Sequence, residues 1–161
     1  MSESSALAGR IRGYLAELDK VVDRTNTLVK KAEATGDDGY WDGVALNLHS
    51  FYSGIERIFE DIARTMDGTL SSGPDWHTSL LVQMTAESTG RRPAAISLET
   101  RFMLDEYRGF RHVVRNVYAF NFRPSRLKEL VDGLQNCYTT VKNELQTFVH
   151  FLETLDTSTK D

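Results

Sequence analysis

The amino-acid sequence predicts an all-α protein, folded as an antiparallel bundle of four long helices and one short helix. Apolar residues recur at three- and four-residue steps along almost the whole chain, which is the spacing of one face of an amphipathic helix. Strand signals are nearly absent, because no segment sustains an apolar/polar alternation and no tight hairpin turn joins two β-branched runs. The segments between the predicted helices are mostly short, which favours antiparallel neighbours.

The first half of the chain predicts two long helices. The first covers residues 5–34 and ends at the Gly-Asp-Asp-Gly sequence of residues 36–39. The second covers residues 40–66 and is followed by a loop-like composition at residues 67–74. The apolar stripes are Leu7, Ile11, Leu15, Leu18, Val22 and Val29 in the first helix, and Leu48, Phe51, Tyr52, Ile55, Ile58, Phe59 and Ile62 in the second.

The second half predicts the short helix and two further long ones. Asp75 is suited to cap a helix of residues 76–86, and Ser97 is suited to cap a helix of residues 98–120. The last helix begins at an Arg-Pro-Ser sequence and extends over about residues 123–155, with proline in its first turn. The expected inner faces are Met103, Tyr107, Phe110, Val114 and Val117 in the first of these long helices, and Leu127, Leu130, Leu134, Tyr138, Val141, Leu145, Phe148 and Leu152 in the last.

Length and composition are those of one ordinary globular domain. We expect residues 1–161 to form a single domain with an ordered core of about residues 5–155, since 40% of the chain is hydrophobic and 26% charged. No apolar run approaches the roughly 20 residues of a membrane helix, and the N-terminal sequence does not resemble a secretory signal. We therefore expect a cytoplasmic protein. The single cysteine, Cys137, excludes an internal disulfide, and the apolar pattern around it predicts a buried thiol.

Positive charge is concentrated in one segment of an acidic chain. Residues 101–126 contain six arginines, no lysine and two acidic residues, which gives a local charge of +4. The whole chain carries −4, so the remainder carries −8. A positive strip in an acidic protein indicates a negatively charged partner, and phosphate is the group that we expect. Arginine rather than lysine favours bidentate contacts to oxyanions.

The arginines form a polar stripe along the predicted helix of residues 98–120. The apolar positions fall toward the other side of that helix, so we expect the stripe to be open to a ligand or a partner chain. A solvated helix face without a specific role is the ordinary alternative. Two features oppose it: acidic pairing is scarce, with only Asp105 near, and the face includes His and Tyr. The stripe and its neighbours are Arg108, Arg111, His112, Arg115, Asn116 and Tyr118.

The sequence Phe110-Arg-His-Val-Val-Arg-Asn-Val-Tyr118 resembles the motif of HEPN domains, in particular that of ribonuclease toxins of the HepT kind. That motif has an Arg, a polar residue, a few further residues, a His and, two positions later, a Tyr. Arg111 matches the arginine and Tyr118 the tyrosine. The order of the helices and the sequence of residues 54–63 are also similar to the HepT kind, so the resemblance covers nearly the whole chain.

Asn116 occupies the position of the motif histidine, and no other Arg–His pair in the chain has the motif's spacing. The resemblance implies metal-independent RNA cleavage, in which the 2′-hydroxyl attacks the adjacent phosphate and the histidine moves protons. Asn has no titratable proton, and loss of a general base costs about 10²–10⁴ in rate. Two explanations are open: the chain is an active-site variant of a toxic enzyme, or the natural protein has lost or altered its catalysis. His112 is a conceivable substitute base.

The resemblance implies roles for the matched residues. Arg111 would bind and stabilise the phosphate, Asn116 would occupy the catalytic proton-transfer position, and RNA would be bound by Arg108, His112 and Arg115. In a regular helix Arg111 and Asn116 lie about 140° apart. They converge if the helix loosens or if two chains face each other, and the resemblance implies a homodimer with a shared cleft.

The resemblance also implies a regulatory partner. An MNT-type nucleotidyltransferase antitoxin would transfer AMP to Tyr118 and so fill the anion site; a half-buried packing tyrosine is the alternative. Two other functions stay open for the whole chain. One is a non-catalytic HEPN-like module that binds RNA, nucleotide or a nucleotidyltransferase partner. The other is a helical adaptor whose basic stripe binds an acidic protein.

Weaker candidates lie outside the motif. We interpret Asp75, Trp76 and His77 as a helix cap followed by an anchoring aromatic residue rather than as a site. The charged residues of the second helix, Glu56, Arg57 and Glu60, either line the same cleft or form a solvated surface. We expect no cofactor and no metal, because no phosphate-binding glycine loop and no converging set of metal ligands is recognisable.

Overall fold

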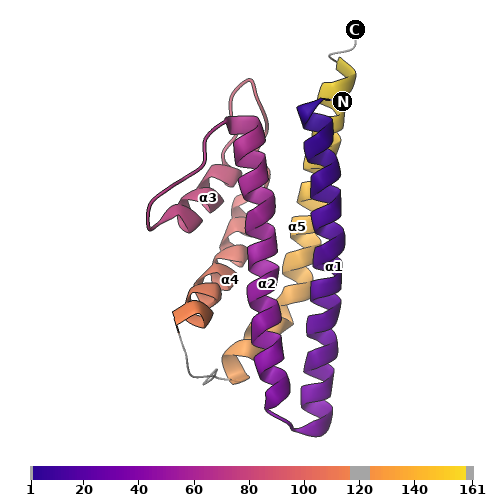
Figure 1. Cartoon of the computed structure of the whole chain (residues 1–161), viewed down its shortest axis with the longest axis vertical. Helices are drawn as coiled ribbons and strands as arrows, with labels where there is room; N and C mark the ends of the chain where they lie inside the picture. Colours follow the sequence, from indigo (N-terminus) through magenta and orange to yellow (C-terminus); the bar gives the residue numbers. More distant parts are fainter. Residues whose placement is uncertain (1, 117–123, 159–161) are drawn as a thin grey trace.

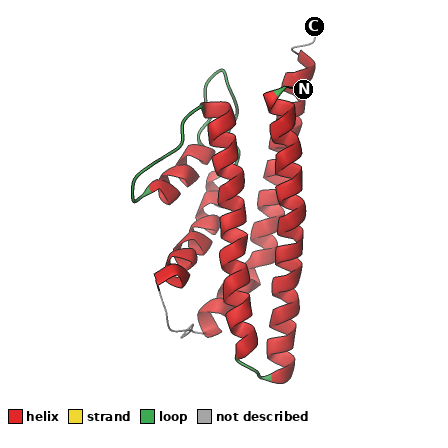
Figure 2. Cartoon of the chain, in the orientation of Figure 1, coloured by secondary structure: helices red, strands yellow, loops and turns green. Residues whose placement is uncertain are grey.

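The computed structural model describes residues 2–116 and 124–158, and their architecture is all-helical (Figure 2). In the described ranges the only β-type pairing is an isolated bridge between Ser88 and Arg92. No helix of these ranges is both long enough and apolar enough to span a membrane. The helices are α1 (Glu3–Thr35), α2 (Gly39–Ile62) with a π-helical continuation η1 (Ala63–Asp67), α3 (Trp76–Thr85), α4 (Leu98–Asn116) and α5 (Pro124–Ser158).

α1 and α2 lie side by side with α5 behind them, and α3 and α4 lie on the side of α2 away from α1 (Figure 1). α1 packs against both α2 and α5, while α4 contacts α2 and α5, and α3 contacts α2 and α4. α2 and α1 approach closely at Gly54, where an added Cβ would lie 2.7 Å from Leu18 Cδ2. The predicted antiparallel bundle is thus confirmed as an all-α fold, and α2 is the helix that α1, α3 and α4 all contact.

The core is built from the apolar stripes of these helices, and aromatic contacts join them. Phe51 of α2 packs edge-on against Tyr107 of α4 at 5.4 Å and against Tyr138 of α5 at 6.0 Å between ring centroids. The two tyrosine hydroxyls donate hydrogen bonds to backbone oxygens, Tyr107 to Leu130 at 2.6 Å and Tyr138 to Leu15 at 2.9 Å. These bonds satisfy polar atoms that would otherwise be buried at a cost, and they fix α4 and α5 in register with their neighbours.

The observed helices follow the predicted ones closely, and the differences are the π-helical end of the second helix, the missing Asp75 cap and the burial of Leu104. α1 ends at Gly36 in the left-handed conformation at φ 68°, as a glycine after a helix favours. The second helix leaves α geometry at Ile62 and finishes as the π-helix η1. Ser97 caps α4 by accepting a hydrogen bond from the Thr100 backbone N–H at 3.2 Å, whereas the Asp75 side chain makes no capping bond to α3. Leu104, which the predicted inner face of α4 omitted, is fully buried.

A buried ion pair holds α3 beside the end of α2. Arg92, in the segment before α4, donates from Nε to Asp67 Oδ1 at 2.7 Å and from Nη2 to Oδ2 at 2.8 Å. The same guanidinium donates to the backbone oxygens of Ala86 and Gln83 at 2.9 and 3.2 Å. Because this bidentate pair uses several donors of Arg92, it is satisfied despite its burial, and the bonds to Gln83 and Ala86 attach the end of α3 to the end of η1.

Candidate functional site

A buried carboxylate lies at the junction of α2, α3 and α4. Glu56 of α2 is only 3% exposed, which is rare for an acidic residue unless it is paired. It lies one helical turn after Tyr52 and one before Phe59, so the periodicity of α2 places it on the inner face of that helix. The alternative interpretation of Glu56 as a solvated surface residue is therefore wrong.

The first turn of α3 brings an imidazole to this carboxylate. His77 Nδ1 lies 2.5 Å from Glu56 Oε2, and the His77 side chain is 22% exposed. The indole ring of Trp76 lies against the His77 ring, with 3.6 Å between centroids and 31° between planes. The interpretation of residues 75–77 as a capped helix start with an anchoring aromatic residue is thus incomplete. Asp75 makes no cap bond, and His77 is a member of a charged cluster.

The arginine of the HEPN-like motif completes the cluster from α4. Arg111 Nη1 lies 3.3 Å from Glu56 Oε1, and 3.1 and 3.2 Å from Nδ1 and Nε2 of His77. Arg111 Nε donates to Ser53 Oγ at 3.2 Å. The Arg111 side chain is 16% exposed, so it lies against α2 and α3 rather than on the open face that we expected. Glu56, His77 and Arg111 are called the Glu56 cluster below.

Burial determines the electrostatics of the Glu56 cluster. Desolvation raises the pKa of Glu56 above its ordinary value, while the hydrogen bond from His77 and the charge of Arg111 act in the opposite direction. The neighbouring Tyr52 is fully buried, and its hydroxyl has no hydrogen-bond partner among the described residues. Its burial also raises the pKa of the phenol. Chemically, the cluster offers a carboxylate-oriented imidazole beside a guanidinium, which are groups for moving a proton and for binding an oxyanion.

The other residues of the predicted site are only partly described. Arg108 Nε donates to Asp105 Oδ1 at 2.6 Å. Acidic pairing of this stripe is therefore less scarce than expected, since both Arg108 and Arg111 have acidic partners. The backbone of α4 includes positions 112, 115 and 116, but the side chains of His112, Arg115 and Asn116 lie outside the described residues, as does the whole of Tyr118.

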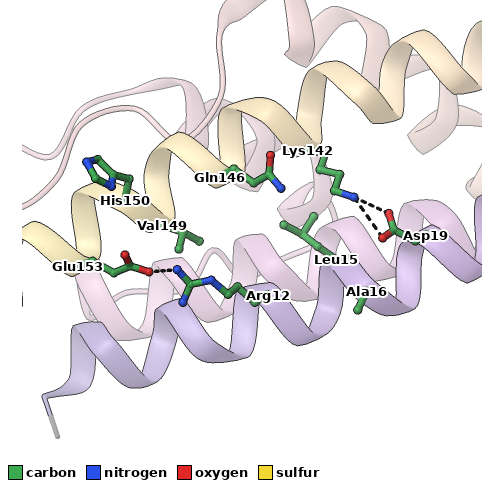
Figure 3. A pocket seen from close by; sticks show the side chains of 9 residues that line it. All are labelled: Arg12, Leu15, Ala16, Asp19, Lys142, Gln146, Val149, His150 and Glu153. Atoms are coloured by element: carbon green, nitrogen blue, oxygen red, sulfur yellow. Dashed lines mark hydrogen bonds and ion pairs between the residues drawn. The ribbon is translucent and has the colours of Figure 1, made fainter.

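A second group of charged side chains lies between α1 and α5 (Figure 3). A cleft of about 430 Å³ between α1 and α5 is lined by two ion pairs, Arg12 with Glu153 and Lys142 with Asp19. The cleft also includes His150, but no group of three potential metal ligands occurs among the described residues. This cleft, with its two ion pairs, is called the α1–α5 cleft below. Cys137 is buried, as predicted, and its pKa is raised by burial to about 12.

Comparison with known proteins places the chain in a family. No similar protein was found among curated proteins or among solved structures. The model of a family described as HepT-like protein matches residues 43–152, which is more than half of the chain. The matched segment includes α3, α4, all three residues of the Glu56 cluster and the HEPN-like motif. The chain therefore belongs to the HepT-like family of HEPN-type, toxin-like helical modules.

Proposed function

We propose that this protein is a HEPN-type, metal-independent endoribonuclease toxin of a toxin–antitoxin system, acting on RNA in the cytoplasm. The observation that carries this proposal is the position of Arg111. It matches the motif arginine, lies within the HepT-like segment and is oriented by Glu56 and Ser53 next to an imidazole. Such an arginine can bind the scissile phosphate and stabilise the charge that develops on it.

Phosphate binding at this site would extend beyond one arginine. Arg111 uses Nε and Nη1 for its contacts, and Nη2 makes no hydrogen bond with the described residues, so a donor is left for a phosphate oxygen. Arg108, His112 and Arg115 would contact neighbouring phosphates along the same helix. Because each phosphate contact releases condensed counterions, RNA binding should weaken steeply with salt.

The RNA-binding cleft, which includes Arg111, would be completed by a second copy of the chain. Leu98 and Phe102 are 54% and 59% exposed on α4, and a homodimer with C₂ symmetry would cover these two apolar side chains. Position 116 lies 18 residues after Leu98, or five full turns, so helical register places it on this same face. Arg111 lies on the other side, and two facing chains are one arrangement that brings both positions to one RNA.

Regulation would act on the same site. An MNT-type nucleotidyltransferase antitoxin would transfer AMP to the Tyr118 hydroxyl, seven residues after Arg111. The added phosphate would be an anion on the motif segment, so it would compete with RNA. HepT-like proteins are generally components of toxin–antitoxin systems, which supports a partner of this class.

A second candidate function is a non-catalytic HEPN-like module that binds RNA, nucleotide or a nucleotidyltransferase. The observation that favours it is Asn116, which cannot transfer a proton. Both candidates share the phosphate-binding role of Arg111 and differ in whether RNA is cut.

Restoring the motif histidine tests the proposed function. The wild-type chain, Asn116→His and the double variant Asn116→His/Arg111→Gln are compared for cleavage of total RNA in EDTA and for growth arrest on expression. We expect Asn116→His to cleave RNA and to arrest growth, and the added Arg111→Gln change to abolish both. Arg24→Gln in the Asn116→His background is the matched control, because Arg24 is exposed on α1.

The second candidate makes a different prediction in the same experiment. If neither the wild-type chain nor folded, dimeric Asn116→His cuts RNA or slows growth, the toxin proposal is wrong. Binding of RNA that depends on Arg111 but produces no cleavage would then establish the non-catalytic module.

A further inference from the structure

We propose that His77 is the catalytic proton-transfer residue of this chain, in place of the histidine that its motif lacks. The inference rests on the proposed ribonuclease function and deepens it. The imidazole comes from α3, outside the motif, yet it lies in contact with the motif arginine: Arg111 Nη1 is 3.2 Å from His77 Nε2. The active site would thus keep the family's pair of groups, an arginine and a histidine, while drawing the histidine from another helix.

Glu56 orients the imidazole for this task. An ionised carboxylate can only accept hydrogen bonds, so the 2.5 Å contact with Glu56 Oε2 assigns the proton to His77 Nδ1. The neutral ring then carries a lone pair on Nε2, which is the tautomer of a general base. A histidine that donates a hydrogen bond to a carboxylate from one ring nitrogen acts as a general base when its other ring nitrogen faces the substrate. Burial of Glu56 at 3% exposure strengthens the orientation, because water cannot replace the bond easily.

Arg111 contacts both ring nitrogens. Its Nη1 lies 3.1 Å from Nδ1 and 3.2 Å from Nε2, and a phosphate bound by Arg111 would draw this guanidinium nitrogen away from Nε2 and free the lone pair. The His77 side chain is 22% exposed, against 3% for Glu56, so the imidazole is the member of this pair that a substrate can reach. A phosphate held by Arg111 would place the adjacent ribose within the roughly 3 Å that proton transfer requires.

The reaction step balances with these groups and solvent water. His77 Nε2 takes the proton from the ribose 2′-hydroxyl, and the 2′-oxygen forms a bond to the adjacent phosphorus. The bond from phosphorus to the 5′-oxygen breaks, and that oxygen takes a proton from solvent water. The hydroxide so formed takes the proton from the His77 imidazolium, which returns to its neutral form. The products are a 2′,3′-cyclic phosphate and a 5′-hydroxyl end, and Arg111 stabilises the charge on the non-bridging oxygens throughout.

A purely structural role for His77 predicts something else. Its bond to Glu56 joins α3 to α2, so a structural histidine would affect stability and leave the chemical step unchanged in any variant that folds. His77→Asn keeps a donor near the Nδ1 position and removes the base. His77→Ala opens a space beside Glu56 that free imidazole in solution can fill.

Single-turnover RNA cleavage separates these roles. The full chain is compared with His77→Asn, His77→Ala with and without added imidazole, and His150→Asn, a control for an exposed histidine on α5. We expect His77→Asn to lose at least about 100-fold in rate, with RNA affinity within about threefold of the wild-type value. Added imidazole should restore the rate of His77→Ala, cleavage products should carry cyclic phosphate, and His150→Asn should match the wild-type chain.

Other outcomes overturn the inference in distinguishable ways. If the wild-type chain cuts RNA and folded His77→Asn or His77→Ala cuts equally fast, His77 is structural and the ribonuclease function stands. If only Asn116→His cuts RNA, position 116 is the sole site for the base, and His77 cannot replace it. If no variant cuts RNA, Asn116→His included, the proposed function fails together with the inference.

Discussion

The Glu56 cluster and the α1–α5 cleft contain similar charged groups in opposite environments. Both have carboxylates paired with cations from neighbouring helices. In the cleft the Arg12 and Glu153 side chains are 59% and 41% exposed, whereas in the cluster Arg111 is 16% exposed and Glu56 only 3%. The cleft is hollow and open (Figure 3), and the cluster is packed among three helices.

The comparison shows that a cleft in the surface and a chemically active site need not coincide. Water screens the charges of the α1–α5 cleft, so these pairs stabilise the fold little. Burial in the Glu56 cluster removes that screening, raises the pKa of Glu56 and holds His77 in one orientation. We therefore place the chemistry in the cluster, although the cleft is lined by a histidine as well.

Removing one cation from each region should give the largest difference in stability between the Glu56 cluster and the α1–α5 cleft. We expect Arg111→Met to lower the free energy of unfolding by about 3 kcal/mol at pH 7, because it leaves the buried Glu56 charge with only His77 as a partner. Arg12→Met, the matched change in the cleft, should cost below about 1 kcal/mol. Urea denaturation of both variants measures the two values. Equal losses would mean that burial does not distinguish the two regions.

The raised pKa of Glu56 should make the stability of the protein depend on pH. Because its pKa is raised in the folded state, Glu56 favours folding below its ordinary value of 4.5, and this contribution is lost as the pH rises through the folded pKa. The ionisable groups that act on it are His77, Arg111 and Glu60. The stability of Glu56→Gln relative to the wild-type chain should therefore increase from pH 4 upward. Urea midpoints across this range give the difference, and a constant difference would contradict the raised pKa.

The smallest effect is expected for the lysine of the α1–α5 cleft. Lys142 binds Asp19 at 2.9 Å, but their side chains are 31% and 44% exposed. Lys142→Met should change the free energy of unfolding by about 0.5 kcal/mol or less, because an exposed pair gains little over hydration. Thermal denaturation at low and high salt measures this change. A loss of several kcal/mol would show that an ion pair of the α1–α5 cleft stabilises the fold as strongly as one of the Glu56 cluster.

The sequence predicts the helices well because their signals are local. Apolar spacing, the glycine at position 36 and the cap at Ser97 each act within one or two turns, and the observed helices follow them. The π-helical end of α2 was not predicted, because no residue marks a change from α to π geometry. The buried Arg92–Asp67 pair is not predictable from local sequence either, because its partners lie 25 residues apart and meet only when the helices pack.

The candidate site was predictable only in part, for the same reason. Arg111 was recognised through its motif, and the position of Asn116 raised the question of the missing histidine. His77 and Glu56 come from two other helices, and no local pattern joins them to Arg111. One signal was available: Glu56 follows Tyr52 and Ile55 and precedes Phe59 in the buried register of α2. A carboxylate in such a register requires a buried partner.

RNA affinity at varied salt tests most directly whether the Glu56 cluster is the functional site. Fluorescence anisotropy of labelled single-stranded RNA is measured for the wild-type chain, Arg111→Gln and Lys142→Gln at a series of salt concentrations. We predict that Arg111→Gln weakens binding and lowers the salt slope by about 1, since one phosphate contact is lost. Lys142→Gln should leave affinity and slope unchanged. Undiminished binding by Arg111→Gln, with a loss in Lys142→Gln, would place the RNA in the α1–α5 cleft and contradict this account.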